Sequence, residues 1–396
     1  MDETFVLFHR VLSFAGISFF AKRNWNSRLW FLLQIFNFII GGLCFVFTSG
    51  FVADNYSNFL LCIQGACIWT TGVIMTISLG ICLIFRNEFR SFLVEMAFRD
   101  GMMDMPLVEY ILSSSLTGQK MSELKDLVIT SQEKLLKYTR VLLRTYVASV
   151  FLCATMYLCS PIYRMFIREN DSLRLLAFDM WFPWSLTNLK VYIMSFIFHA
   201  YAGYLCCVAY PGLQLTIILL LGQLIRQIRI LAFILLHMNE LVLEMTGIQD
   251  EIWFSARSYN RLNVICRPFY LALILVAIML VCMCSVKIAI SNKLSLDTMK
   301  YYVHELCFIL VVLMFCSLGQ QVENECEALE KAVTEKWYIF NKTHKTNIRI
   351  FYLALSQRMP IYIFGTITLS LPTFTWFIKT GMSFFTLVMS VLEEEN

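Results

Sequence analysis

Proline and charged residues are both scarce in this chain, and each shortage excludes a class of protein. Only 7 of the 396 residues are proline, too few for a collagen-like or proline-rich disordered chain. Charged residues make up 15% and hydrophobic residues 58%, and the mean hydropathy is +0.66, which does not suit a surface that faces water. The 14 cysteines lack the regular spacing of a disulfide framework. The composition therefore predicts an integral membrane protein.

Motifs that carry enzyme or transport chemistry are also missing. The 5 histidines form no His-x-x-His or His-Glu-x-x-His pattern, and no Cys-x-x-Cys pair stands in a metal-ligand context. The sequence has no glycine-rich phosphate loop, no nucleophile elbow, no paired intramembrane carboxylates and no internal repeat. A formal charge of +4 is too small to indicate nucleic-acid binding. We therefore expect no enzyme activity, no cofactor, no metal and no nucleic-acid partner.

Long apolar runs are abundant. A helix needs about 20 apolar residues to cross roughly 30 Å of hydrocarbon. Seven runs reach that length, and they predict an all-α membrane protein with seven transmembrane helices: Leu29–Phe51, Asn58–Phe85, Val141–Tyr163, Asn188–Leu221, Pro268–Ser291, Tyr302–Gln320 and Ile361–Val391. The start of the chain, residues 1–22, is predicted to form an interfacial amphipathic helix, because an acidic pair stands where a signal peptide has basic residues.

Basic residues are unevenly divided between the two sides of these spans. The N-terminal segment and the second, fourth and sixth connections hold 23 Lys and Arg, whereas the other connections hold 5. Basic loops resist translocation, so the richer side is predicted to be cytoplasmic. The N-terminus is then inside and the C-terminus outside. Two sequons, at Asn55 and Asn170, fall in connections that this topology places outside, and they are the predicted glycosylation sites.

This topology argues against a G-protein-coupled receptor, the first class that seven spans suggest. That class has its N-terminus outside and a cytoplasmic tail. Its Asp-Arg-Tyr and Asn-Pro-x-x-Tyr strings are both missing here. Only five residues, 392–396, follow the last span, too few for a signalling surface.

The seventh run is too long for one crossing. Its 31 residues would reach about 46 Å as a single helix. Pro372 is the expected breakpoint, because proline removes a backbone donor and clashes with the preceding turn. The chain then divides into residues 1–346 with six spans, a cytoplasmic apolar helix over 347–371 that serves assembly, and a final crossing within 372–396. The fourth span also continues as basic and apolar turns to His237, so we expect helical extensions covered by neighbouring subunits; an intramolecular bundle is the alternative.

Short motifs near the C-terminus resemble those of insect odorant receptors. Lys379-Thr-Gly-Met-Ser-Phe-Phe-Thr-Leu-Val-Met-Ser-Val391 is similar to the family's C-terminal signature, and Leu369-Ser-Leu-Pro-Thr-Phe374 to the stretch before it. Further upstream, the resemblance extends to Cys316-Ser-Leu-Gly319, Glu323-Asn-Glu325, Trp337-Tyr338 and, before the fourth span, Trp181-Phe-Pro-Trp184. The chain departs at Gly381-Met382, where the family usually has Ser-Tyr. It also lacks the long second cytoplasmic loop of the co-receptor, Orco, and so resembles a ligand-tuning subunit.

The resemblance implies a function. Members are similar in being tetrameric, odorant-gated, non-selective cation channels in the plasma membrane of olfactory sensory neurons. Their tuning subunits assemble with Orco among the membrane lipids, bind a small volatile ligand, and share a central pore formed by their last helices. A gustatory-type receptor of similar topology is the nearest alternative.

The last helix carries the candidate gate. Positions three and four apart share a helix face. Ser383, Leu387 and Val391 therefore form one stripe, with Phe384 and Ser390 beside it. The resemblance implies that Leu387 and Val391 close the pore as an apolar ring that excludes water, and that Ser390 contacts passing ions.

The ligand site is expected in the outer halves of spans two to six. A volatile ligand needs a dry, aromatic-rich pocket with one or two polar groups. The candidate residues are those aromatic, sulfur-bearing or hydrogen-bonding side chains that the topology places there: Trp69, Thr71, Met156, Tyr157, Tyr192, Phe196, His199, Tyr301, Tyr302 and His304.

Overall fold

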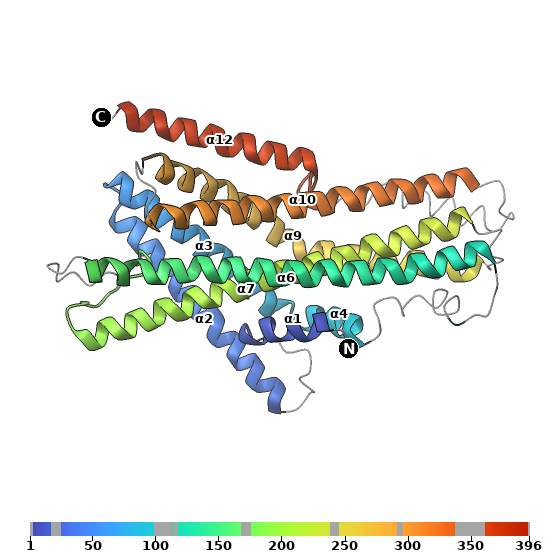
Figure 1. Cartoon of the computed structure of the whole chain (residues 1–396), viewed down its shortest axis with the longest axis horizontal. Helices are drawn as coiled ribbons and strands as arrows, with labels where there is room; N and C mark the ends of the chain where they lie inside the picture. Colours follow the sequence, from blue (N-terminus) through green and yellow to red (C-terminus); the bar gives the residue numbers. More distant parts are fainter. Residues whose placement is uncertain are drawn as a thin grey trace.

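Long helices make up almost all of the described chain. The computed structural model describes residues 3–16, 25–98, 113, 118–167, 176–237, 245–290, 296–336 and 361–394. Figure 1 shows the elongated bundle that these segments form. The helices are α1 (Glu3–Phe14), α2 (Trp25–Asp54), α3 (Phe59–Ile84), α4 (Arg86–Phe98), α6 (Gln119–Ile167), α7 (Leu189–Leu236), α9 (Met245–Ile290), α10 (Leu296–Lys336) and α12 (Leu371–Glu394).

Within the described residues, seven helices are long and apolar enough to cross a membrane. They are α2, α3, α6, α7, α9, α10 and α12, in the order that the hydropathy pattern gives. Each contains or closely overlaps one of the seven predicted runs. The predicted all-helical, multi-pass membrane architecture is therefore confirmed.

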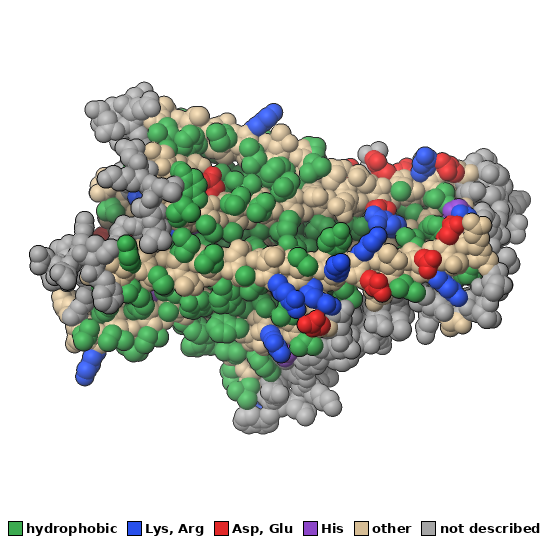
Figure 2. All heavy atoms as spheres, in the orientation of Figure 1, with side chains coloured by type: hydrophobic (Ala, Val, Ile, Leu, Met, Phe, Trp, Pro, Cys, Tyr) green, Lys and Arg blue, Asp and Glu red, His purple; other side chains and the backbone are tan. Residues whose placement is uncertain are grey.

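Four of these helices are much longer than a bilayer requires. Helices α6, α7, α9 and α10 have 49, 48, 46 and 41 residues. At about 1.5 Å per residue they reach roughly 60–75 Å, about twice the hydrocarbon thickness. The face shown in Figure 2 carries most of its charged side chains at one end of the bundle, where α6, α7 and α10 extend, and the other end is mostly apolar. The helical extensions predicted from the sequence are thus present, and α6, α9 and α10 share them.

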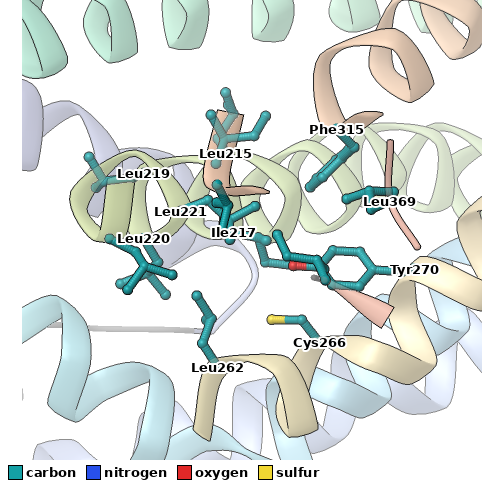
Figure 3. Close-up of a cluster of buried hydrophobic side chains, with 14 of the residues drawn as sticks. Leu215, Ile217, Leu219, Leu220, Leu221, Leu262, Cys266, Tyr270, Phe315 and Leu369 are labelled. Carbon is teal, nitrogen blue, oxygen red and sulfur yellow. The ribbon is translucent and has the colours of Figure 1, made fainter. Parts of the chain in front are cut away.

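Helix α7 lies at the centre of the bundle from Leu205 to Leu235, whereas its first turns, with Leu189 and Met194, are exposed. Its C-terminal half, including Leu224, Ile228 and Leu231, is buried by helices of the same chain. Figure 3 shows α7 side chains converging with Leu262 and Tyr270 of α9. We expected neighbouring subunits to cover this extension, and that expectation is wrong for α7. The alternative, an intramolecular bundle, holds, because the equally long α6, α9 and α10 supply the covering apolar faces.

The segment before the last helix is a hairpin and not the predicted helix. Strand β1 (Tyr362–Phe364) pairs antiparallel with β2 (Ile367–Thr368) through a turn in which Gly365 has a φ of +56°. The helix prediction for 347–371 is therefore wrong over 361–370, and residues 347–360 lie outside the described part. Aromatic and β-branched residues around a glycine favour a hairpin, a signal that apolar composition alone does not resolve. Helix α12 begins beside Pro372, where the break was expected.

The N-terminal helix packs against the outside of the bundle. Phe8 and Leu12 of α1 are buried, and Leu12 lies against Gly212 of α7. Glu3 forms ion pairs of 3.2 Å with both Arg140 and Arg144 of α6. The helix predicted for this segment is present, whereas its place at the membrane interface stays a prediction.

Candidate functional site: an apolar cavity and an exposed helix face

A cavity lies between α3, α6, α7 and α10. Its volume is about 100 Å³, measured as the space open to the centres of water-sized molecules. Each helix lends one face, because its lining residues recur every three or four positions. The helix wall consists of Ile68, Thr71, Gly72 and Met75 of α3; Tyr146, Val150, Cys153, Ala154 and Tyr157 of α6; Ala202, Gly203, Cys206, Cys207 and Tyr210 of α7; and His304, Cys307 and Phe308 of α10, with Cys44 of α2.

The inner end of the cavity is closed by aromatic side chains. The rings of Tyr210 and Phe308 stack with centroids 5.4 Å apart. Tyr146 donates a hydrogen bond to the side-chain oxygen of buried Gln214, one turn further along α7. This end lies deeper in the bundle than the outer halves of the helices, where we expected the whole pocket to be.

The outer end of the cavity is closed by the segment between α6 and α7. Phe178 and Met180 of this segment line the cavity. The backbone N–H of Phe178 donates to His199 Nδ1 at 3.2 Å. Tyr157 Oη and His304 Nδ1 stand 3.4 Å apart. Ring systems thus stand at both ends of the cavity.

Polar groups on the wall are few and mostly occupied. The hydroxyl of Thr71 donates to the carbonyl of Ile68 at 2.7 Å, within its own helix. Tyr157 and His304 pair with each other. Among the described residues, no cluster of three His, Cys, Asp or Glu side chains could hold a metal. Such a wall suits an uncharged, mostly apolar molecule held by dispersion contacts.

The ten predicted ligand residues fall into three groups. Thr71, Tyr157 and His304 line the cavity. His199 and Tyr301 stand one layer behind the wall, against the rings of Phe178 (5.6 Å) and Tyr157 (6.2 Å) respectively. The other five lie off the wall: Trp69, Met156, Tyr192, Phe196 and Tyr302. Ligand contact by any of the ten stays a prediction.

Small and sulfur-bearing residues make up much of the wall that sequence reasoning missed. Five cysteines line the cavity, and all five are free thiols: Cys44, Cys153, Cys206, Cys207 and Cys307. The candidates predicted from the sequence were mainly aromatic and hydrogen-bonding side chains, and none of these cysteines was among them. Their helical spacing from predicted residues could have found some of them. Cys153 lies one turn from Tyr157, and Cys307 lies three residues after His304.

The last helix presents an open face. α12 packs on α9 and α10 at one edge of the bundle (Figure 1) through a side that includes buried Phe377 and Gly381. In an apolar stretch of 18 residues of α12, only 11% are buried within the chain. All five predicted gate residues lie on the exposed side: Ser383, Phe384, Leu387, Ser390 and Val391.

A polar stripe runs along this exposed side of α12. Its members are three or four positions apart and are all exposed: Thr375, Lys379, Ser383, Thr386 and Ser390. The hydroxyls donate to carbonyls of the same helix, for example Ser383 to Lys379 at 2.9 Å and Ser390 to Leu387 at 2.8 Å. Leu387 and Val391, exposed by 59% and 42%, lie beside the stripe. The open face thus combines hydroxyl groups with large apolar side chains.

The two predicted glycosylation sites have different outcomes. Asn55 follows α2, on the turn that leads to α3, and its side-chain nitrogen donates to the carbonyl of Phe51 at 2.9 Å. Asn170 lies outside the described residues. Glycosylation at both positions stays a prediction.

Comparison with known proteins decides the family. The sequence profile described as 7tm Odorant receptor matches residues 119–382, most of the chain. The chain belongs to the odorant receptor family. Membership also agrees with the expectation that it is not an enzyme, since this is a family of receptors. No curated protein sequence matches the chain.

Solved structures of an insect receptor share the fold. Olfactory receptor OR5 from Machilis hrabei in complex with eugenol aligns with a TM-score of 0.80 over 98% of this chain and 97% of that one, at 11% identity. A second OR5 structure aligns with a TM-score of 0.75 over 98% of this chain and all of the other, at 12% identity. At this level of identity the likeness concerns the fold.

Proposed function

We propose that the chain is a subunit of an odorant-gated, non-selective cation channel. A small hydrophobic volatile binds in the cavity, and the exposed face of α12 lines a pore shared with co-receptor (Orco) subunits in a heterotetramer. The receptor works in the plasma membrane of olfactory sensory neurons, with its N-terminus in the cytosol. The observation that carries the proposal is the combination of an apolar cavity with an exposed, hydroxyl-bearing helix in a member of this receptor family.

The cavity supports ligand binding within the membrane domain. Its wall consists of apolar, aromatic and sulfur-bearing side chains with few unoccupied polar groups. Dispersion contacts with such a wall decline gradually as ligand shape departs from cavity shape, so tuning is graded. The related OR5 was solved with eugenol.

The face of α12 supports a shared pore. A helix surrounded by lipid gains nothing from an exposed line of Ser, Thr and Lys side chains, whereas a helix beside water and ions does. Leu387 and Val391 then form the apolar constriction of the closed state, and Ser383 and Ser390 line the path on either side of Leu387. Several copies of α12 are needed to enclose a pore, which requires assembly.

Helix α10 supports a route from the cavity to the pore helix. His304, Cys307 and Phe308 of this helix line the cavity. Gly319, eleven residues after Phe308 and about 16 Å along the same helix, lies so close to Leu369 that a Cβ on it would overlap the Leu369 carbonyl oxygen. Leu369 precedes α12 by two residues. A shift of α10 on ligand binding would therefore displace the start of the pore helix.

Gating in this form is a shift of populations. A ligand that binds the open arrangement more tightly than the closed one favours opening by the difference in binding free energy. A few kcal/mol is enough to move a mostly closed population to a mostly open one.

The distribution of Lys and Arg supports the proposed orientation, because the richly basic connections join the extended ends of the bundle.

Current recording tests the proposal. Cells expressing the chain with the co-receptor are exposed to a panel of volatile odorants, and cells expressing the co-receptor alone set the baseline. We expect an odorant-evoked cation current that requires this chain. Surface-labelled receptor that gives no current with any panel member, together with co-receptor responses that this chain does not alter, would contradict it.

A further inference from the structure

The segment before α7 folds inward over the cavity. Residues 176–184, here called the strap, join the α6 side of the bundle to α7 at the left-hand end in Figure 1. Ala177 and Met180 of the strap are buried. The backbone N–H of Trp181 donates to the carbonyl of Phe47 in α2 at 3.0 Å. Together with the bond from Phe178 to His199, this fixes the strap at two backbone positions.

A chain of polar contacts ties the strap to two further helices. Gln64 of α3 donates to Asp179 Oδ2 at 2.9 Å, and Lys287 of α9 donates to Gln64 Oε1 at 2.9 Å. Hydrogen bonds that involve a charged group are stronger than neutral ones. The strap therefore has a defined position relative to α3, α7 and α9, and the side chain of Phe178 is placed with it.

The ring of Phe178 lies against a glycine. A Cβ built on Gly203 of α7 would stand 3.1 and 3.2 Å from two carbons of this ring, closer than most carbon contacts. The same ring is 5.7 Å from the ring of Tyr157 on α6. Phe178 thus spans the outer end of the cavity from α6 to α7, and it can do so because position 203 has no side chain.

A second phenylalanine of the strap occupies a different place. Phe182 packs against Phe47 at 5.1 Å and Trp184 at 5.1 Å, and it does not line the cavity. Both rings also contact the ring of His199, at 5.6 Å for Phe178 and 5.4 Å for Phe182. Both residues are thus phenylalanines of the strap that contact His199, but only Phe178 lines the cavity.

We propose that Phe178, seated against Gly203, determines the length of ligand that this receptor accepts. The inference rests on the proposed ligand-binding role of the cavity and adds the residue that sets its size limit. The opposite end is fixed by Tyr210, seven residues from Gly203 on the same helix, or about 10 Å along its axis. The accepted ligand is an uncharged molecule shorter than that distance, and the Phe178 ring forms the wall against which a longer chain stops.

The proposal predicts opposite effects for the two partners. Phe178→Ala removes the outer wall, so the cavity accepts longer ligands. Gly203→Ala adds a methyl group to the cavity wall and requires the Phe178 ring to shift by a few tenths of an ångström, so shorter ligands are preferred. Each methylene that fits contributes about fourfold in affinity, and one that does not fit reverses the gain.

Straight-chain 2-alkanones from 2-pentanone to 2-undecanone are suitable probes. The full chain is expressed with the co-receptor, and the half-maximal concentration for current is measured for each ketone. A second readout is the shift in unfolding temperature of the purified chain that each ketone produces. We expect the preferred chain length to rise by about two or three carbons in Phe178→Ala and to fall in Gly203→Ala. Phe178→Leu, a milder change, should raise the preferred chain length by about one carbon.

Phe182→Ala is the matched control and should leave the preferred length unchanged. An unchanged optimum in both Phe178 variants, or an equal change in Phe182→Ala, would overturn the inference. So would the lack of a temperature shift with any ketone in every variant. A length preference that follows the predictions in unfolding temperature without any current would support this inference while contradicting the proposed gating function.

Discussion

Helices α7 and α12 are both apolar enough to cross a membrane, yet they differ more than any other pair of described spans in what covers them. In an apolar stretch of 18 residues of α7, 89% are buried inside the subunit, whereas in the corresponding stretch of α12 only 11% are buried. α7 is surrounded by α3, α6, α9 and α10, and α12 touches α9 and α10 on one side. The apolar surface of α7 is thus mostly covered by its own chain, whereas most of the apolar surface of α12 is not. We infer that α7 maintains the fold and that α12 acts in the assembled channel.

Shortening a side chain of α7 should have the largest effect on stability. Leu231 is 1% exposed, so Leu231→Ala leaves a cavity that the surrounding helices cannot fill completely. We expect a loss of about 2–5 kcal/mol in the free energy of unfolding. Leu387→Ala on α12, where the side chain is 59% exposed, should change it by less than about 0.5 kcal/mol. Denaturant unfolding of the purified subunit measures both, and equal losses would contradict the comparison.

The contact between α10 and the start of α12 should give the next largest effect. Gly319→Ala places a Cβ on the Leu369 carbonyl, so the helix or the hairpin must move. Overpacking of this kind costs about 1–3 kcal/mol, and here it should also weaken the response to ligand. Gly42→Ala on α2 is the control, since a Cβ there meets nothing within 4 Å. A normal dose response in Gly319→Ala would show that this contact does not transmit gating.

A polar substitution on the open face of α12 should change the channel without changing the fold. Leu387→Ser replaces part of the proposed apolar ring with a wetted group, so current in the absence of ligand should rise about tenfold, equivalent to about 1.4 kcal/mol. Met382 is also exposed, by 52%, but points about 140° away around the helix. Met382→Ser should therefore leave basal current near the wild-type value. Similar basal currents in the two variants would contradict the proposed role of Leu387 in closing the pore.

An ion pair between the extended parts of α7 and α10 should have the smallest effect. Arg229 of α7 donates to Glu325 of α10, with Nε at 2.9 Å from Oε1. Half of the Arg229 side chain is exposed, so solvent screens the pair. A double-mutant cycle with Arg229→Gln and Glu325→Gln should give a coupling of about 0.2–1 kcal/mol. A value several times larger would mean that the extension depends on charge more than on the burial of α7.

Features that follow from the periodicity of the sequence could be predicted, whereas features that depend on close contact between distant segments could not. The seven spans and the break beside Pro372 follow from hydropathy and from proline chemistry. That Ser383, Leu387 and Val391 share one face of α12 follows from spacing of three and four. The hairpin at Gly365 was missed because a short apolar run fits a helix or a strand equally well.

The candidate ligand site shows the same division. Thr71, Tyr157 and His304 could be selected by residue type and position along their helices. The Phe178 and Gly203 pair could not, because their contact joins a loop to a helix and depends on the absence of a side chain. The internal burial of α7 also escaped prediction, since it needs three other helices that continue equally far beyond the membrane.

Cysteine accessibility along α12 tests most directly the claim that its open face lines the pore. Single cysteines are placed at Ser383, Leu387 and Ser390, and at Phe377 on the buried side, in chains co-expressed with the co-receptor. A charged, thiol-specific reagent is applied from outside during ligand-evoked current. The account predicts block at the three open-face positions, faster with ligand present, and no block at Phe377 beyond that of the unmodified chain. Equal block at all four positions, or none at the open face, would contradict it.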